Sequence, residues 1–307
     1  MNTLELEKTI TFNNVLVATD FSEVSAHALH TAAAIAEGND AELFLLNVVP
    51  PEPHIPVPLD PLPLDLDSPY QQAIHGLEKL AETEPLAHVR HQQIIERGHI
   101  GDVVEEVVQQ REIDLLVVGT HGRTGIRKIV LGSVAEELFR RASCPVLTVG
   151  PWATLGRKIQ RVLFATDFGP SSEHALPYAM GFANKVGGEL ILLHLVSPIP
   201  VNYVGPGWFP DDGMVQKEEA SKQEFMKKLR NLVPAEAGLS CKVKHVVELH
   251  FAAEGIIQAA RQHEADLVVM GVRESGRSAA QIASHMPWAV AYEVVCYANC
   301  PVMTIRS

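Results

Sequence analysis

Short apolar runs alternate with amphipathic segments along the whole chain. In the first half, the apolar runs predict strands at residues 15–18, 42–48, 89–96, 115–118 and 146–149, and the amphipathic segments predict helices at 22–37, 70–83, 101–110 and 133–141. Most of the runs are continuous rather than alternating, which indicates strands that are covered by helices on both faces. This alternation of strands and helices favours an α/β fold with a parallel, doubly wound sheet.

The second half of the chain repeats the first. The segment VLVATDF at 15–21 returns as VLFATDF at 162–168, an offset of 147 residues. Four further segments match in the same order: 25–29 with 172–176, 45–48 with 192–195, 113–119 with 265–271, and 142–149 with 298–305. The sequence therefore predicts two five-stranded domains of one design in tandem, at 1–150 and 151–307. The stretch from 150 to 158, which contains Pro151 and Gly156, is predicted to link them.

Composition and charge narrow the classes of partner. The chain has 307 residues and a formal net charge of -12. An acidic surface repels phosphate backbones, which argues against nucleic acid as a partner, although a backbone-lined site can still hold one small anion. No segment has the apolar length of a membrane span, and the first ten residues lack the apolar core of a signal peptide. Four cysteines in a chain of this length do not form a disulfide framework, so we expect a reduced, cytoplasmic protein.

The most informative stretch follows the fourth predicted strand of the first half. It reads GTHGRTG at 119–125, and nine residues separate Gly122 from the pair Gly132-Ser133. Glycines let a phosphate chain approach the backbone, and amides at Gly132 and Ser133 would begin a helix whose free N–H groups favour an anion. The side chains of Ser133, Arg123, Arg127 and Lys128 would add a hydroxyl donor and positive charge. His121 lies in the same stretch, and the sequence leaves open whether it contacts ligand or faces water.

The position of this stretch supports a binding site. In an open parallel sheet, ligands lie beyond the carboxyl ends of the strands, where the strand order reverses. The first strand here ends at Thr19-Asp20 and the fourth ends at Gly119. We therefore expect the glycine-rich stretch to face the end of the first strand.

Structural explanations compete with the binding interpretation. Ser133 and Glu136 have the spacing of a capping box, which would satisfy the first N–H groups of the helix without a ligand. The glycines could serve only to make turns, and Asp20 could simply cap the helix that follows it.

The stretch from Gly119 through Gly122 to Gly132-Ser133 resembles the nucleotide-binding signature of the universal stress protein family, and the resemblance covers nearly the whole chain as a tandem member. It implies the strand order 3-2-1-4-5 and a bound ATP, with or without Mg²⁺. It also implies that Ala18, Asp20 and Val48 contact adenine. Ribose and phosphates would be held by Val118, Gly119, Gly122, Gly132, Ser133 and Val134. The candidate binding set is completed by Thr19 beside Asp20 and by Arg123.

The second half departs from this signature. Gly271 is followed by VRESGR, so that Glu274 takes the place of the second glycine unless two residues are inserted. The Gly-Ser pair is absent: the equivalent position falls on Met286-Pro287 or on Trp288-Ala289, depending on the alignment. Proline offers no N–H, tryptophan fills space, and a carboxylate repels phosphate. We therefore predict a degenerate second copy that serves packing, pairing or a different ligand.

Several other chemistries are disfavoured. Cys296 and Cys300 are spaced like a weak metal or redox pair but have no second pair nearby. His88 with His91 and His245 with His250 lie near the third strands, but their spacings differ between the halves. The segment from Gly150 to Lys158 has the wrong spacing for a P-loop. No motif places a serine or cysteine nucleophile beside a histidine, so no catalytic residue is assigned.

The sequence leads to three functional hypotheses. The first is a stress-response sensor or regulator that binds adenine nucleotide in its first half and signals to an unidentified protein partner. The second is a slow ATPase or a phosphate- or adenylate-transferring enzyme, and the third is a structural or chaperone-like protein with a vestigial pocket. Intrachain pairing of the two halves through strands 146–149 and 302–305 is expected, and dimerisation of the whole chain is left open. The Pro-rich connections at 50–69 and 198–210 are predicted to be surface loops, with a lid or partner contact as the alternative.

Overall fold

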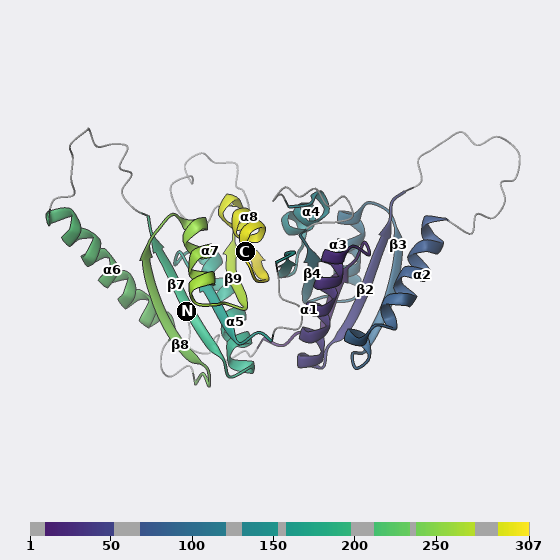
Figure 1. Cartoon of the computed structure of the whole chain (residues 1–307), viewed down its shortest axis with the longest axis horizontal. Helices are drawn as coiled ribbons and strands as arrows, with labels where there is room; N and C mark the ends of the chain where they lie inside the picture. The colour runs from purple at the N-terminus through teal and green to yellow at the C-terminus, as the bar shows by residue number, and fades with distance from the viewer. Residues whose placement is uncertain are drawn as a thin grey trace, which may run out of the picture. The chain divides into compact units, whose positions relative to one another are not determined.

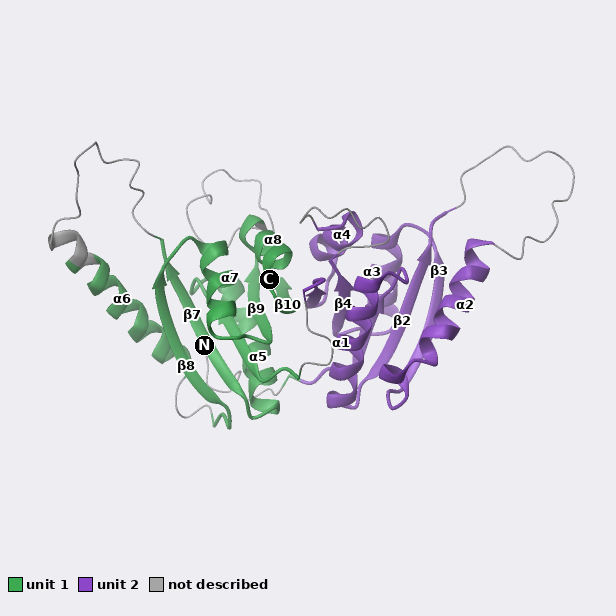
Figure 2. Ribbon diagram, in the orientation of Figure 1, with its two compact units in different colours: residues 1–10, 157–307 green, residues 11–156 purple. Residues whose placement is uncertain are grey.

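Strands and helices alternate through both halves of the computed structural model (Figure 1), which describes residues 10–51, 68–120, 131–152, 158–197, 212–233, 238–273 and 288–306. The chain forms two compact units (Figure 2): one comprises Thr11–Gly156, and the other comprises Arg157–Ser307 together with Met1–Ile10. The grouping of the first residues differs from the domain division expected from the repeat. Ile10 lies against the second unit, with its Cβ 3.5 Å from where a Cβ on Gly181 would stand.

The first unit is a five-stranded parallel sheet with helices between successive strands. Its elements are β1 (Asn14–Ala18), α1 (Glu23–Asn39), β2 (Glu42–Val49), α2 (Pro69–Ala81), the short 3-10 helix η2 (Glu84–Leu86), β3 (His91–Arg97), α3 (Ile100–Gln110), β4 (Leu115–Gly119), α4 (Ser133–Arg141) and β5 (Val146–Val149). The strands pair in the order β3-β2-β1-β4-β5. The predicted fold class and strand order are confirmed.

The second unit repeats this arrangement. Its elements are β6 (Arg161–Ala165), α5 (Pro170–Lys185), β7 (Glu189–Val196), α6 (Asp212–Leu232), β8 (Lys242–Leu249), α7 (Ala252–Gln262), β9 (Leu267–Val272), α8 (Trp288–Tyr297) and β10 (Val302–Arg306). The order β8-β7-β6-β9-β10 is that of the first unit, and every pair is parallel. No helix in the described part of the chain is long and apolar enough to cross a membrane.

The continuous apolar runs occupy the central strands because those strands are buried on both faces. On one face of the first unit, Leu16 of β1, Leu46 of β2 and Leu116 of β4 form a core with buried residues of α3 and α4. The strand residues between them, such as Val15 and Val17, are also fully buried, as expected for side chains that alternate across a covered sheet. This packing fixes the strand ends, where the candidate site lies.

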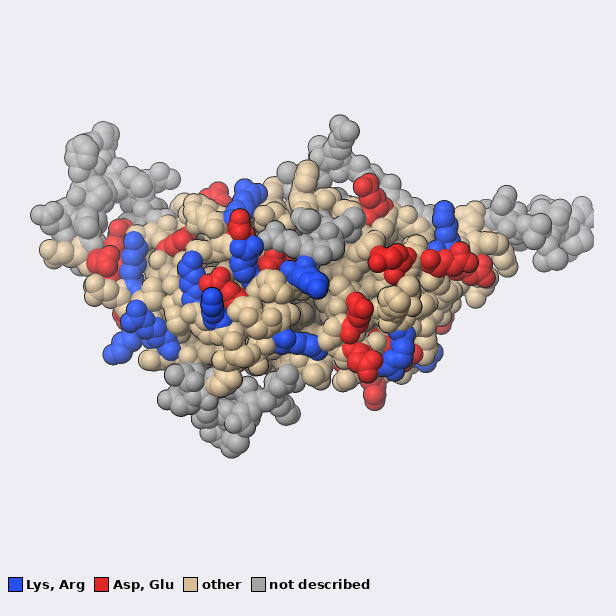
Figure 3. Space-filling view, turned by 60° about the horizontal axis from the view of Figure 1, so that its bottom comes forward, with Lys and Arg blue, Asp and Glu red and all other residues tan. Residues whose placement is uncertain are grey.

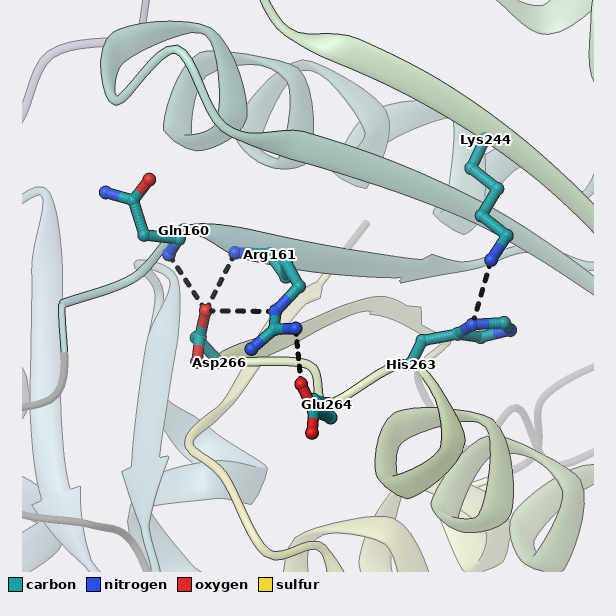
Figure 4. A network of polar contacts seen from close by, with 6 residues as sticks. All are labelled: Gln160, Arg161, Lys244, His263, Glu264 and Asp266. Carbon is teal, nitrogen blue, oxygen red and sulfur yellow. Dashed lines mark hydrogen bonds and ion pairs between the residues drawn. The ribbon is translucent and has the colours of Figure 1, made fainter.

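An aspartate ties the start of the first strand to the start of the fourth strand in each unit, partly buried in the first unit and buried in the second. Asp114, just before β4, accepts hydrogen bonds from the backbone N–H groups of Asn13 (2.7 Å) and Asn14. Its carboxyl also has a raised pKa, because burial disfavours the charged form more than these amides favour it. Asp266, just before β9, accepts from the backbone N–H groups of Gln160 (3.0 Å) and Arg161 (2.8 Å), as Figure 4 shows. The aspartate that repeats in the sequence therefore has a structural role.

Replacing Asp266 by alanine is expected to lower the free energy of unfolding by about 2–3 kcal/mol, because two backbone N–H groups lose their buried acceptor. Urea unfolding of the full chain measures the change. The matched control is Glu264→Ala, since Glu264 also pairs with Arg161 (2.5 Å) but is largely exposed. Surface pairs contribute about 0–1 kcal/mol, so equal losses in the two variants would contradict the structural role of Asp266.

Two boundaries differ from the sequence prediction for a local reason. The third strand begins at His91 rather than at 89, because the N–H of Val89 donates to the carbonyl of Leu86 (3.2 Å) and closes a turn. The second helix ends at Ala81, and η2 occupies the residues between it and that turn.

The two units carry different charge. Residues 11–150 contain 9 Lys and Arg against 20 Asp and Glu, whereas residues 158–306 contain 14 against 15. On the face shown in Figure 3, acidic side chains are more frequent over the first unit and basic side chains over the second. An anionic ligand of the first unit must therefore be held by local backbone dipoles and nearby cations rather than by the charge of the whole unit.

Candidate functional site

The reversal of strand order in the first unit lies between β1 and β4. These strands pair in register up to Ala18 and Val118, so that their carboxyl ends meet at one edge of the sheet. Residues inside the strands are fully buried, but Ala18, Val48 and Gly119 at the strand ends are partly exposed. Exposed apolar atoms at the switch point of a parallel sheet form a surface on which a planar ligand can rest.

A compact turn follows β1. The N–H of Phe21 donates to Thr19 Oγ1 (3.1 Å), and the N–H of Ser22 donates to Asp20 Oδ1 (3.0 Å). Phe21 adopts a left-handed backbone conformation, with φ of 64°. Thr19 is also hydrogen-bonded to Ser25 of α1 through its hydroxyl (3.1 Å). The side chains of Thr19 and Asp20 therefore shape the turn that presents the end of β1. The alternative that Asp20 caps α1 is wrong, because Ser22 occupies the N-cap position.

Asn47 holds this turn from the neighbouring strand. Its side-chain N–H donates to the carbonyl of Thr19 at 2.8 Å, and the residue is buried. In the second unit His194 takes its place, and its Nδ1–H donates to the carbonyl of Thr166 at 2.8 Å. Neither residue is among the candidates predicted from the sequence. The signal that could have identified them is a polar residue at the same place within two otherwise apolar strands.

Replacing Asn47 by alanine is expected to cost about 1–2 kcal/mol of unfolding free energy, because the carbonyl of Thr19 loses its buried donor. Thermal and urea unfolding measure the loss. Asn47→His is expected to recover most of it, since a ring N–H serves the same carbonyl in the second unit. A histidine variant no more stable than the alanine variant would show that this hydrogen bond is not what stabilises the turn.

Gly119 is needed for packing between the sheet and a helix. A Cβ on Gly119 would stand 3.1 Å from both Val24 Cγ1 and the carbonyl oxygen of Val24 in α1. At the equivalent Gly271, a Cβ would stand 2.1 Å from the carbonyl oxygen of Ser171 in α5. Close approach of a helix thus accounts for both glycines, without a phosphate.

Helix α4 begins at the edge of the same site. The N–H of Gly132 donates to the carbonyl of Thr120 at 2.8 Å, which anchors the start of α4 to the end of β4. The prediction that this amide is free for an anion is therefore wrong. The helix starts one residue later, so Ser133 and Val134 carry the first amides that have no acceptor within the helix.

The capping-box alternative for Ser133 is also wrong. Gly132 occupies the N-cap position and Ser133 the first helical position, and no side chain among the described residues caps the helix. Glu136 instead pairs with Arg140 at 2.9 Å. Ser133 and Val134 are exposed, and 47% of the surface of Val134 is accessible. The start of α4 therefore presents amide donors and an apolar side chain at the switch point.

Part of the candidate site lies outside the described residues. This applies to Gly122 and Arg123, and to the neighbouring His121, Arg127 and Lys128. The structure brings together the other candidates, which are Ala18, Thr19, Asp20, Val48, Val118, Gly119, Gly132, Ser133 and Val134.

The second unit keeps the turn but differs in its surroundings. The N–H of Phe168 donates to Thr166 Oγ1 (2.9 Å), and Phe168 has φ of 58°. The ring of Phe168 packs with those of His194 and Phe225, with centroid separations of 4.7 and 5.9 Å. In the first unit, the ring of Phe21 instead lies against Gly76 of α2. Of the segment that departs from the glycine signature, residues 274–287 lie outside the described part, and α8 begins at Trp288.

The alternative chemistries find no support in the described residues. All four cysteines are buried and free, so Cys296 and Cys300 are not bonded to each other. Burial raises the pKa of Cys144 to about 12, which makes it a poor nucleophile. The described residues contain no cluster of histidine, cysteine or carboxylate side chains that could hold a metal ion.

Comparison with known proteins agrees with this geometry. A family model described as the universal stress protein family matches residues 11–150 and again residues 158–306. The chain belongs to the universal stress protein family. The two matches are the two halves of the internal repeat, so this is a tandem member of the family.

Individual relatives match either one half of the chain or nearly all of it. A universal stress protein of Methanocaldococcus jannaschii is 33% identical over 142 residues, which are 45% of this chain and 82% of the relative. A universal stress protein of Mycolicibacterium smegmatis is 27% identical over 305 residues, covering 95% of this chain and 96% of the relative. The solved structure of a universal stress protein from Archaeoglobus fulgidus has a TM-score of 0.68 at 20% identity and covers 96% of this chain and 97% of its own. The last comparison supports the fold alone.

Proposed function

We propose that this universal stress protein binds one ATP, with or without Mg²⁺, at the switch point of its first unit and acts as a cytoplasmic stress-response sensor or regulator rather than as an enzyme. The observation that carries the proposal is the start of α4. It is anchored to β4 through the bond from Gly132 to Thr120, no side chain in the described part of the chain caps it, and it exposes Ser133 and Val134. The four free, buried cysteines are compatible with a reducing compartment.

The proposed roles follow from where each residue lies. Adenine would rest at the ends of β1 and β2, on the partly exposed Ala18 and Val48, beside the turn at Asp20. Phosphates would be held by the amides of Ser133 and Val134 and by the hydroxyl of Ser133. Gly132 would not bind phosphate through its N–H, which donates to the carbonyl of Thr120, but would hold the start of α4 in place. The roles of Gly122 and Arg123 rest on the sequence resemblance.

Electrostatics favours an anion at this position despite the acidic first unit. A hydrogen bond from an amide to a charged group contributes about 1.5–3 kcal/mol, and the helix dipole about 0.3–1 kcal/mol. The acidic residue of the first turn, Glu136, is paired with Arg140, which reduces its repulsion of phosphate. Nucleotide binding would change the surface around α4, which is the change that a partner protein would recognise.

Mass spectrometry of the small molecules released on denaturing freshly purified protein tests the proposal. ATP or another adenine nucleotide in near-equal amount to the chain is the expected result. Added ATP that is converted to ADP and phosphate well above background would favour the slow ATPase instead. A chain that neither carries nor takes up any adenine nucleotide would favour the structural or chaperone-like alternative.

A further inference from the structure

The two units differ at the start of the helix that follows their first strand. In the first unit, Ser22 caps α1, and its hydroxyl oxygen accepts a hydrogen bond from the N–H of Ser25 at 3.2 Å. In the second unit, Gly169 takes the place of Ser22, and no side chain among the described residues caps α5. The second unit has thus lost a stabilising cap, and Gly169 leaves the space that a side chain would take.

An arginine side chain enters this space. Arg273 follows β9 directly, and its Nη2 lies 2.9 Å from where a Cβ on Gly169 would stand. The carboxylate oxygens of Asp167 lie 3.0 and 3.1 Å from the same point. The guanidinium of Arg273 and the carboxylate of Asp167 therefore flank one small volume between the ends of β6 and β9.

Asp167 is held toward this volume by its own surroundings. Its Oδ1 accepts hydrogen bonds from the N–H of Gly169 (2.8 Å) and from the hydroxyl of Ser172. Opposite charges on Asp167 and Arg273 favour this arrangement. The polar groups of Asp167 and Arg273 thus lie close together at the second switch point.

We propose that Arg273 closes the ligand position of the second unit, by placing its guanidinium where a nucleoside would lie against the turn at Asp167. The inference rests on the proposed function, because the nucleoside position is taken from the first unit. Gly169 and Arg273 form a matched pair in this arrangement: a serine at 169, as in the first unit, would push the guanidinium away. Nucleotide binding is thereby restricted to the first unit by a side chain, in addition to the altered glycine segment.

Adenosine is the probe that separates these two causes, because it needs no phosphate-binding loop. In an ¹H–¹⁵N correlation spectrum of the full chain, adenosine is expected to shift the amides of Thr19, Asp20 and Phe21 and to leave those of Asp167, Phe168 and Gly169 in place. In Arg273→Ala and in Gly169→Ser, both groups of amides are expected to shift, and the number of bound adenosines is expected to rise from one to two. Arg261→Ala removes an exposed arginine of the same unit and is expected to behave like the wild type.

The outcomes distinguish this inference from the proposed function. If adenosine shifts the first group in both variants but never the second, Arg273 does not close the site and the inference is overturned. If the second group already shifts in the wild-type protein, the site is open and the inference is again overturned. If adenosine and ATP shift neither group in any variant, the proposed function itself fails and the inference fails with it.

Discussion

Replacing Ser133 by proline is expected to weaken ATP binding by about 10- to 100-fold while leaving α4 intact. The loss follows from one missing N–H, since a hydrogen bond to a charged group contributes about 1.5–3 kcal/mol and about 1.4 kcal/mol corresponds to tenfold in affinity. Ser133 is the first residue of α4, where proline is well tolerated. Gly132 has φ of -61° and ψ of 148°, a conformation that a following proline permits. Isothermal titration with ATP measures the change, and circular dichroism checks the helix content.

Ser133→Ala is the matched control for this variant. It removes the hydroxyl and keeps the N–H, so a smaller loss of affinity is expected. Equal losses in the two variants would assign the contribution to the hydroxyl rather than to the amide. Full ATP affinity in the proline variant would show that the start of α4 does not hold the phosphates.

Replacing Gly271 by alanine is expected to lower the free energy of unfolding by about 3 kcal/mol, at the upper end of what overpacking costs. The added Cβ would stand 2.1 Å from the carbonyl oxygen of Ser171 and 2.6 Å from the backbone N of Ser172. Because these are backbone atoms, the whole first turn of α5 must move away from β9. A flexible side chain in the same place would only have to rotate. Urea unfolding of the full chain measures the loss.

Gly119→Ala provides the comparison at the equivalent position of the first unit. Its nearest contacts would be 3.1 Å, to Val24 Cγ1 and the Val24 carbonyl oxygen, so a shift of a few tenths of an ångström suffices and a loss of about 1 kcal/mol is expected. Equal destabilisation in the two variants would contradict the difference in helix approach between the units.

Much of the fold could be predicted from the sequence because it depends on burial, and the pattern of apolar residues along the chain indicates which positions are buried. The apolar runs gave β5 and the amphipathic segment gave α4 with the bounds that the structure has, 146–149 and 133–141. The edge strand β3 was placed two residues early, because an apolar residue at 89 can belong to a strand or to a turn. Only the hydrogen bond from Val89 to Leu86 decides between them.

The candidate site was less accessible to sequence reasoning, because its hydrogen bonds join residues that are distant in the chain. The repeat and the glycine spacing located the switch point, but they could not show that the N–H of Gly132 is used by Thr120. Nor could they show that Ser133 follows the N-cap instead of occupying it, a difference of one residue that removes the capping box. The role of Asn47 could not be predicted, because its side chain donates to the carbonyl of Thr19, 28 residues earlier in the chain. The proximity of Gly169 and Arg273 could not be predicted either, because only the fold brings these two residues together.

Binding of one nucleotide per chain, in the first unit, can be measured by isothermal titration of the full chain with ATP at constant Mg²⁺, repeated with Ser133→Pro. About one ATP per chain is expected for the wild-type protein, and a strongly weakened single site is expected in the variant. Two equivalent sites, or a site that the variant leaves unchanged, would contradict the proposed function.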